Sequence, residues 1–266
     1  MAFMRSCLCL SSSGAGFEIP RYRYSNMLSS VTMLVTYVVL GLPVGVIGIP
    51  WALLTGDIGP LYRWSMWVVR CGVRLARIRV QIEGREGIPA EPSIFMANHV
   101  SNLDPPIMLP LLPFRTAFFI KRSLLKIPLV GYGMRLAGFV PVDRDGRLES
   151  ARESVQAANK VLASGVNIST FPEGTRSRTG RLLPFKKGPF YLAMESGAPV
   201  VPISIWGSEH MMTKGSLRIK PGTAHLTFHP AVYPQQFATR EQLAEAVRAA
   251  ITSALPQWMW GDDHGS

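Results

Sequence analysis

From Ile78 onward, short apolar runs alternate with stretches of helical periodicity, and this alternation limits the possible fold more than any other feature of the chain. Seven apolar runs of four to six residues have the length of buried strands. Strands that alternate with helices build a parallel or mixed sheet whose two faces are covered by those helices. We therefore predict an α/β domain over residues 81–257, with a central, mostly parallel or mixed sheet flanked by helices.

The predicted elements follow one another through short connections. Strands are expected at Ile78–Ile82, Ser93–Ala97, Ala117–Lys121, Phe139–Val142, Val166–Phe171, Val200–Ile205 and His225–His229. Helices are expected at Pro105–Leu112, Leu124–Leu136, Leu148–Ala163, Pro189–Ser196 and Arg240–Leu255. Thr239 and Gln242 have the spacing of a capping box, and Gly165 and Gly197 follow their helices at the usual C-cap position.

The segment before this domain is apolar and carries no charged residue between Arg23 and Asp57. Val31–Leu54 is long enough to span a bilayer core, which needs about 20 apolar residues. Glycines and prolines interrupt residues 41–50, so a broken or re-entrant helix is an alternative to a clean span. A buried core helix is disfavoured because the stretch is apolar all round.

A second helix, predicted at Leu61–Val80, is amphipathic. Leu61, Trp64, Trp67, Val68, Cys71 and Leu75 recur at helical spacing, while Arg70, Arg74 and Arg77 share another face. Tryptophan and arginine on one helix suit the headgroup region of a membrane, although a surface helix packed on the domain is an alternative. We predict that residues 25–80 form a membrane-docking helical segment, after a disordered leader at 1–24. A frayed tail is expected at 258–266.

Composition narrows the class of partner. The chain has 266 residues, 47% of them hydrophobic, which excludes a disordered protein. A net charge of +11 favours anionic partners such as phosphorylated ligands, acidic lipid surfaces or nucleic acid. Three cysteines offer neither a disulfide framework nor metal-ligand spacing, and His225 and His229 share one strand face without a third ligand. We therefore expect no metal.

The stretch Ile94–Pro106 contains a histidine and an aspartate five residues apart. A strand is predicted to end at Asn98. Asp104 before two prolines is typical of a helix start, because an Asp side chain caps free N–H groups and proline is tolerated in the first turn. His99 and Asp104 would then flank one strand-to-helix loop at the carboxyl end of a strand, where α/β sheets place their active sites. A carboxylate that accepts Nδ1–H leaves the other ring nitrogen free to take a proton from a hydroxyl.

A second polar stretch, Phe171–Arg178, follows an apolar strand and has the features of an anion-binding loop. Gly174 lets the backbone approach a ligand, and the guanidinium of Arg176 can donate two hydrogen bonds to a phosphate. Glu173 is expected to pin that arginine or to meet a ligand hydroxyl. Lys186–Gly188 precede a helix whose N-terminus would also favour an anion.

A third stretch, Gly138–Arg144, ends a predicted strand on another arginine. Each polar stretch by itself is typical of a solvated charged loop. Two arginines at the ends of neighbouring strands, beside a His/Asp pair, together indicate an anion-binding active site. Their clustering near His99, without interleaved aromatic residues along one face, argues against nucleic acid as the partner.

Four of these blocks resemble, in order and spacing, the motifs of the glycerolipid acyltransferases, and within them the 1-acylglycerol-3-phosphate (lysophosphatidic acid) acyltransferases. Asn98–Asp104 is similar to the His-x4-Asp catalytic motif of that family, and the other matching blocks are Gly138–Arg144, Phe171–Ser177 and Val201–Ile205. The resemblance covers roughly Ser93–Trp206. The upstream apolar and Trp/Arg segments resemble the membrane-docking element of the family.

The resemblance implies an activity and a set of roles. His99 would deprotonate the sn-2 hydroxyl of lysophosphatidic acid, with Asp104 orienting the ring. The glycerophosphate would be bound by Arg144, Glu173, Gly174, Thr175 and Arg176. Acyl-CoA or acyl-ACP would donate the acyl group directly, without a cofactor or covalent intermediate, to give phosphatidic acid. The family also implies a membrane location, with the active site on the cytoplasmic face of the inner (plasma) membrane.

Two alternatives stay open at this point. One is the same chemistry on another acceptor, such as a lyso-ornithine lipid, a lysophospholipid or glycerol-3-phosphate. The other is a membrane-tethered basic protein that binds anions without catalysis. The sequence also leaves open the acyl chain length, the choice between CoA and ACP, the start residue and the oligomeric state.

Overall fold

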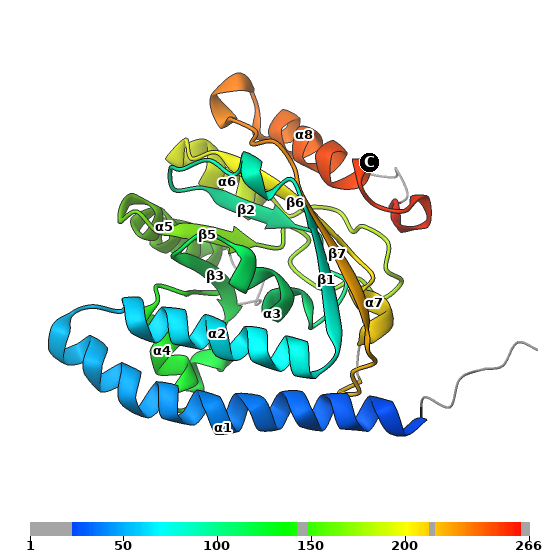
Figure 1. Ribbon diagram of the computed structural model, residues 1–266. Helices are drawn as coiled ribbons and strands as arrows, with labels where there is room; N and C mark the ends of the chain where they lie inside the picture. The colour runs from blue at the N-terminus through cyan, green and yellow to red at the C-terminus, as the bar shows by residue number, and fades with distance from the viewer. Residues whose placement is uncertain (1–22, 143–147, 213–215, 262–266) are drawn as a thin grey trace, which may run out of the picture.

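The computed structural model describes residues 23–142, 148–212 and 216–261. Within these ranges, seven strands form one sheet in the order β1-β7-β6-β2-β5-β3-β4, with helices on both faces (Figure 1). Neighbouring strands are parallel except for the antiparallel pair β6–β7. The predicted fold class, a mixed α/β sheet flanked by helices, is confirmed. Most of the expected leader (1–22) and the end of the expected tail (262–266) lie outside the described residues.

All seven predicted strands are present, with ends that differ from the prediction by at most three residues. They are β1 (Ile78–Glu83), β2 (Ile94–Ala97), β3 (Thr116–Lys121), β4 (Val140–Val142), β5 (Asn167–Thr170), β6 (Val200–Trp206) and β7 (Gly222–Phe228). Strand β2 lies between β5 and β6, so it is central and covered on both faces.

The side chains of β2 alternate between two hydrophobic cores, as the period of a strand requires. Phe95 and Ala97 belong to the core beneath the N-terminal helices and the short helix after β2. Ile94 and Met96 belong to the opposite core, beneath three helices from the second half of the chain. All four are fully buried, which explains why this strand reads as a continuous apolar run.

The helices of the domain are α3 (Asp104–Met108), α4 (Val130–Leu136), α5 (Leu148–Ala163), α6 (Lys187–Ser196), α7 (Ser208–Met211) and α8 (Arg240–Ser253). The capping box of Thr239 and Gln242 is confirmed at the start of α8. Gly197 and Gly165 have φ values of 66° and 81°, so both end their helices in the left-handed conformation expected of a glycine C-cap. Helix α7 was not predicted.

The single helix predicted at Leu124–Leu136 is wrong. The structure has a 3-10 helix at Arg122–Lys126, an extended residue at Ile127, and α4 from Val130. Pro128 explains the break, because a proline ring disfavours the helical conformation of the residue before it and removes one backbone donor. Leu129 follows with φ 58°, which redirects the chain into α4.

Helix α1 (Arg23–Thr55) is continuous through Pro43 and Pro50, so the alternative of a broken helix is wrong. Met27–Thr55 is long and apolar enough to cross a membrane. Most of its apolar side chains, such as Leu34 at 64% and Leu54 at 87% exposure, do not pack on the protein. Figure 1 shows α1 running antiparallel to α2 along one side of the domain.

Helix α2 (Gly59–Leu75) is shorter than predicted. It ends at Leu75 because Arg77 turns the chain with φ 59° and residues from Ile78 pair with β7, so the helical prediction for 76–80 is wrong. The buried face of α2 contains Leu61, Tyr62, Val68, Gly72 and Val73. Trp64, Trp67 and Leu75 are exposed, and so are Arg63, Arg70 and Arg74. The residues of the predicted apolar face are therefore split between a buried set and an exposed set, and both tryptophans belong to the exposed set.

The C-terminal segment is packed on the domain, so the prediction of a frayed tail is wrong for residues 258–261. Gln257–Met259 form a 3-10 helix whose Met259 is fully buried. The carbonyl of Met259 accepts a hydrogen bond from the N–H of Leu182, and the indole of Trp260 donates to the carbonyl of Leu255. The first of these contacts ties the C-terminal segment to the loop that follows β5.

Close approach of α1 to α2 depends on a glycine. A Cβ atom at Gly72 would lie 2.2 Å from a ring carbon of Tyr37 on α1. We predict that Gly72→Ala lowers the free energy of unfolding by about 1–3 kcal/mol through overpacking. Gly41→Ala is the matched control, because a Cβ there would meet no atom within 4 Å. Thermal unfolding of the detergent-solubilised variants measures the difference, and equal melting temperatures would contradict the described helix packing.

Candidate active site

The loop after β2 starts from a fixed point at the carboxyl edge of the sheet. The side-chain amide of Asn98 donates to the carbonyl of Ile205 and accepts from the N–H of the same residue, at 2.8 and 2.7 Å. Asn98 thus continues the pairing of β2 with β6 by one residue through its side chain. His99 follows immediately, and α3 begins at Asp104, so the predicted strand–loop–helix context of the His/Asp pair is confirmed.

His99 and Asp104 form the expected pair. His99 Nδ1 lies 2.8 Å from Asp104 Oδ2, and the two side chains are 12% and 0% exposed. Because the carboxylate oxygen is an acceptor, the ring proton lies on Nδ1 and the lone pair on Nε2. Nε2 has no hydrogen-bond partner within the described ranges. The arrangement therefore presents a basic nitrogen to a ligand while the other nitrogen is fixed.

Asp104 does not cap α3, contrary to the prediction from the Asp-Pro-Pro sequence. The N-cap residue of α3 is Leu103, and no side chain within the described residues caps that helix. Asp104 Oδ2 instead accepts hydrogen bonds from the backbone N–H groups of Val100 and Ser101, each at 2.8 Å. Oδ1 accepts one from the hydroxyl of Ser208 at 2.5 Å. With His99 these donors number four, and they compensate for the burial of the carboxylate charge.

The Phe171–Ser177 block packs directly on His99, because β5 is the neighbour of β2. The ring of Phe171 stacks on the imidazole with centroids 4.0 Å apart and planes 13° apart. The N–H of Ser177 donates to the carbonyl of His99, and the N–H of His99 donates to Glu173 Oε1, both at 2.8 Å. The predicted meeting of the His/Asp loop with this block is therefore confirmed.

Glu173 lies beneath the loop and is 1% exposed. Its second oxygen, Oε2, accepts from the N–H of Leu183 at 3.3 Å. Burial raises the pKa of Glu173 to about 8; the nearby Asp104 adds to the rise, while the N–H donors of His99 and Leu183 oppose it. Both oxygens are occupied by backbone groups, so the prediction that Glu173 contacts the substrate is not supported by its position.

The residues after Glu173 reach the surface. Gly174 and Thr175 are exposed and Arg176 is half-buried. Gly174 has φ 70°, and a Cβ atom there would lie 3.2 Å from the side chain of Lys186, so this position requires glycine. The N–H of Lys186 donates to the carbonyl of Pro172, which brings the start of α6 to the same loop. Arg176 and the exposed Lys186 thus form a cationic surface beside the loop that holds His99.

The third block is placed differently from the prediction. Arg144 lies outside the described residues, so its role stays a prediction. Strand β4, which precedes it, is separated from β5 by β3. The interpretation of Arg144 and Arg176 as residues at the ends of neighbouring strands is therefore wrong, because strand order depends on packing that the local sequence does not record.

Sequence reasoning missed Ser208, the residue that holds the second oxygen of Asp104. It lies directly after β6, at the start of α7, and is fully buried. One signal was present in the sequence: a glycine and a serine, Gly207 and Ser208, follow the last apolar block. This pair indicates a role in the site only when β6 is known to pair in parallel with β2, because the carboxyl ends of the two strands then lie side by side.

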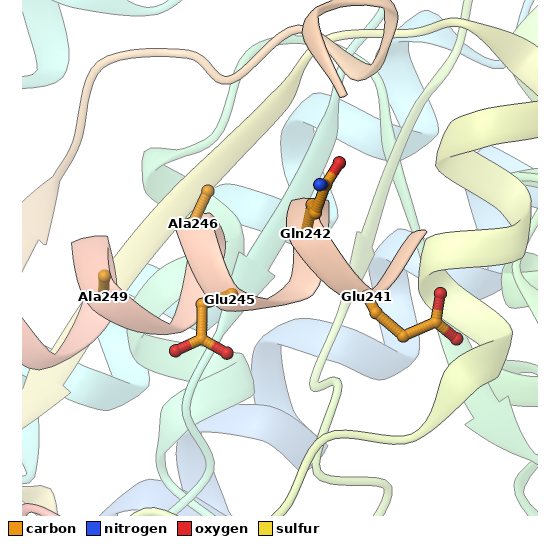
Figure 2. Close-up of a pocket in the computed structure, with 5 residues that line it drawn as sticks. All are labelled: Glu241, Gln242, Glu245, Ala246 and Ala249. Atoms are coloured by element: carbon orange, nitrogen blue, oxygen red, sulfur yellow. The ribbon is translucent and has the colours of Figure 1, made fainter. Parts of the chain in front are cut away.

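Two other features of the surface do not add to the site. The described ranges hold no group of three or more His, Cys, Asp or Glu side chains that could bind a metal. Figure 2 shows a depression whose lining residues all come from α8: Glu241, Gln242, Glu245, Ala246 and Ala249. Its two carboxylates would repel a phosphorylated ligand, and none of its residues takes part in the hydrogen bonds around His99.

Comparison with known proteins agrees with this geometry. The sequence profile of the family described as Acyltransferase matches residues 79–206. The 1-acyl-sn-glycerol-3-phosphate acyltransferase of Limnanthes douglasii is 30% identical over 200 residues, which cover 75% of this chain and 70% of that protein. The chain belongs to the acyltransferase family. An enzyme of the same name from Chlamydomonas reinhardtii is 35% identical over 201 residues, but the match spans only 58% of its length and 74% of this chain.

A solved structure shares the fold. The 1-acyl-sn-glycerophosphate (LPA) acyltransferase from Thermotoga maritima is 30% identical, with a TM-score of 0.73. The match covers 86% of this chain and 94% of that one. The similarity therefore extends over nearly the whole of that acyltransferase and over most of this chain.

Glu173 makes the stability of this acyltransferase depend on pH. With a pKa of about 8 when folded and near 4.5 when unfolded, the carboxyl holds a proton in the folded state that the unfolded chain releases. Its contribution to the free energy of unfolding therefore falls as pH rises from 5 to 8, by up to about 1.4 kcal/mol per pH unit. We predict that Glu173→Gln removes this slope.

Urea unfolding in detergent at several pH values between 5 and 8 measures that slope. Glu173→Gln is expected to be less stable overall, because its amide nitrogen cannot accept a backbone N–H. Glu245→Gln, on the exposed face of α8, is the matched control and should keep the wild-type slope. The same slope in wild type and Glu173→Gln would show that Glu173 is already ionised when folded.

Proposed function

We propose that the protein transfers a fatty acyl group from an acyl thioester to the sn-2 hydroxyl of 1-acylglycerol-3-phosphate, giving phosphatidic acid. One observation carries this proposal: a buried Asp104 fixes His99 Nδ1 at 2.8 Å, and Nε2 is left without a protein partner within the described ranges. The names of the similar proteins supply the substrate, since both plant and bacterial relatives are called acyltransferases of this lysophospholipid.

His99 is the general base of the proposed reaction. Nε2 takes the proton of the sn-2 hydroxyl, and the oxygen attacks the carbonyl carbon of the thioester. The tetrahedral intermediate collapses with cleavage of the C–S bond, and the imidazolium returns its proton to the departing thiolate. Asp104 stabilises the imidazolium between these two steps. The acceptor is the only nucleophile required, so no acyl-enzyme forms.

The glycerophosphate is proposed to bind on the cationic surface beside His99. Gly174 and Thr175 expose backbone and hydroxyl groups there, and Arg176 supplies a planar guanidinium suited to a phosphate. Arg144 is the fourth proposed contact. Glu173, whose oxygens hold backbone N–H groups, acts on the substrate only through the position of His99.

Acyl-CoA or acyl-ACP is the proposed co-substrate, and the proposed reaction uses no further cofactor or metal. Its balance needs only the hydroxyl, the thioester and one histidine that accepts and returns a proton. A purely anion-binding protein is disfavoured, because such a protein would have no use for a histidine whose proton is fixed by a buried carboxylate. Another lysolipid acceptor would use the same groups, and a comparison of acceptors in the thiol-release assay distinguishes it from lysophosphatidic acid.

The membrane is the proposed source of the acceptor. Helix α1 exposes apolar side chains along its length, and α2 adds exposed Trp64 and Trp67. Aromatic side chains of this kind favour the headgroup region of a bilayer, next to the arginines of the same helix. We place the active edge of the sheet on the cytoplasmic face of the inner (plasma) membrane, where acyl thioesters are available.

Acceptor-dependent thiol release tests the proposed function. Detergent-solubilised protein is incubated with oleoyl-CoA, with and without lysophosphatidic acid, and free thiol and phosphatidic acid are quantified. We predict release that requires the acceptor and falls on the order of 10²- to 10⁴-fold in His99→Ala, the usual effect of losing a general base. His225→Ala is the matched control, since that ring stacks on Trp206, outside the His99 network.

Two outcomes would contradict the proposal. Equal rates in wild type and His99→Ala would remove His99 as the base. Release that requires glycerol-3-phosphate, a lyso-ornithine lipid or another lysophospholipid, but not lysophosphatidic acid, would replace the proposed acceptor while keeping the chemistry.

A further inference from the structure

The carboxylate of Asp104 has two oxygens with unequal surroundings. Oδ2 accepts from His99 and from two backbone N–H groups of the same loop. Oδ1 faces a different part of the chain and accepts from Ser208 Oγ. Among the described residues Oδ1 has no other donor. One hydroxyl, from a residue 104 positions away, therefore decides how this end of the carboxylate is held.

The backbone around Ser208 is shaped for this contact. Gly207 has φ 90°, and a Cβ atom there would lie 2.3 Å from the carbonyl oxygen of Thr223 on β7. Only glycine allows the chain to pass this close to β7 while turning from β6 into α7. The other end of α7 also holds the catalytic loop, because Ser101 Oγ donates to the carbonyl of Met212 at 3.1 Å. The segment 207–212 thus brackets the loop at two points.

From this geometry we infer that Ser208 is a positioning residue for catalysis, which acts on His99 through Asp104. The inference rests on the proposed function, in which His99 is the base. Ser208 donates its hydroxyl hydrogen to Oδ1, which keeps the carboxylate plane fixed and its charge compensated while Oδ2 holds the imidazole. Ser208 itself does not meet the substrate, because it is fully buried behind Asp104.

Loss of the hydroxyl has a defined chemical consequence. In Ser208→Ala, Oδ1 would be a buried acceptor without a donor, which is unfavourable for a carboxylate. The group would relieve this by rotating or by taking up a proton, and either change weakens its hold on Nδ1–H. The result is a poorer base with an unchanged substrate site, so kcat falls while the KM values for both substrates stay near wild type.

The test compares four variants in the thiol-release assay with oleoyl-CoA and lysophosphatidic acid. We expect kcat of Ser208→Ala to fall roughly 10- to 100-fold, by analogy with the loss on removing the hydrogen-bond partners of metal-binding histidines. Ser208→Thr keeps a hydroxyl and should recover most of that loss. Ser169→Ala is the matched control: this serine is also fully buried, and its hydroxyl has no hydrogen-bond partner among the described residues. His99→Ala sets the lower limit.

A second readout does not depend on turnover. A hydrogen bond between histidine and a carboxylate gives a strongly downfield proton NMR signal, which is assigned here by its loss in His99→Ala. In the folded, detergent-solubilised protein this signal should shift or broaden in Ser208→Ala and stay unchanged in Ser169→Ala. It reports the position of the Nδ1 proton even where a variant is less stable.

The outcomes distinguish the role of Ser208 from the proposed function. If Ser208→Ala keeps the kcat and the NMR signal of Ser169→Ala while His99→Ala is inactive, the role of Ser208 is overturned and the proposed function stands. A Ser208→Ala variant that loses only thermal stability, with wild-type kcat per folded molecule, overturns it equally. If His99→Ala keeps the wild-type rate, the proposed function itself fails.

Discussion

The buried carboxylate of Asp104 is the group on which the rest of the site depends. A charge in a fully buried position is tolerated only when donors surround it, and here they come from the ring of His99, two N–H groups of its own loop and Ser208. Each donor also fixes a piece of structure. Because these donors come from the loop after β2 and from α7 after β6, the orientation of the imidazole depends on the folded sheet.

The surroundings of His99 divide between two neighbours of β2. On the β5 side, Phe171 stacks on the ring, while Glu173 and Ser177 hold the two backbone groups of His99. On the β6 side, Asn98 pins the start of the loop and Ser208 the end of the Asp104 side chain. Rigidity is thus concentrated behind the histidine. The exposed Gly174 and Thr175 and the half-buried Arg176 reach the surface on the neighbouring loop, where we propose that the phosphorylated acceptor binds.

Much of this could be predicted from the sequence, for reasons that are local. Short apolar runs mark the strands, and a His/Asp spacing across a strand-to-helix loop marks the pair. What failed depended on hydrogen bonds, backbone breaks and strand order that these patterns do not record. Asp104 was expected to cap its helix, but the four donors that hold its carboxylate (the ring of His99, two N–H groups of its own loop and Ser208) all lie outside that helix. Pro128 breaks a helix whose apolar pattern continues past it, whereas α1 runs through Pro43 and Pro50. Ser208 stands next to Asp104 only because β6 pairs with β2, a fact of topology that no local pattern carries.

In the proposed reaction, His99 activates the acceptor hydroxyl and the acyl group passes directly to it. Incubation of the protein with radiolabelled oleoyl-CoA, first alone and then with lysophosphatidic acid, tests this most directly when combined with initial rates at varied concentrations of both substrates. Direct transfer predicts no protein-bound label without acceptor and intersecting double-reciprocal plots, as for a ternary complex. A covalent acyl-enzyme that the acceptor discharges, or the parallel plots of ping-pong kinetics, would contradict it.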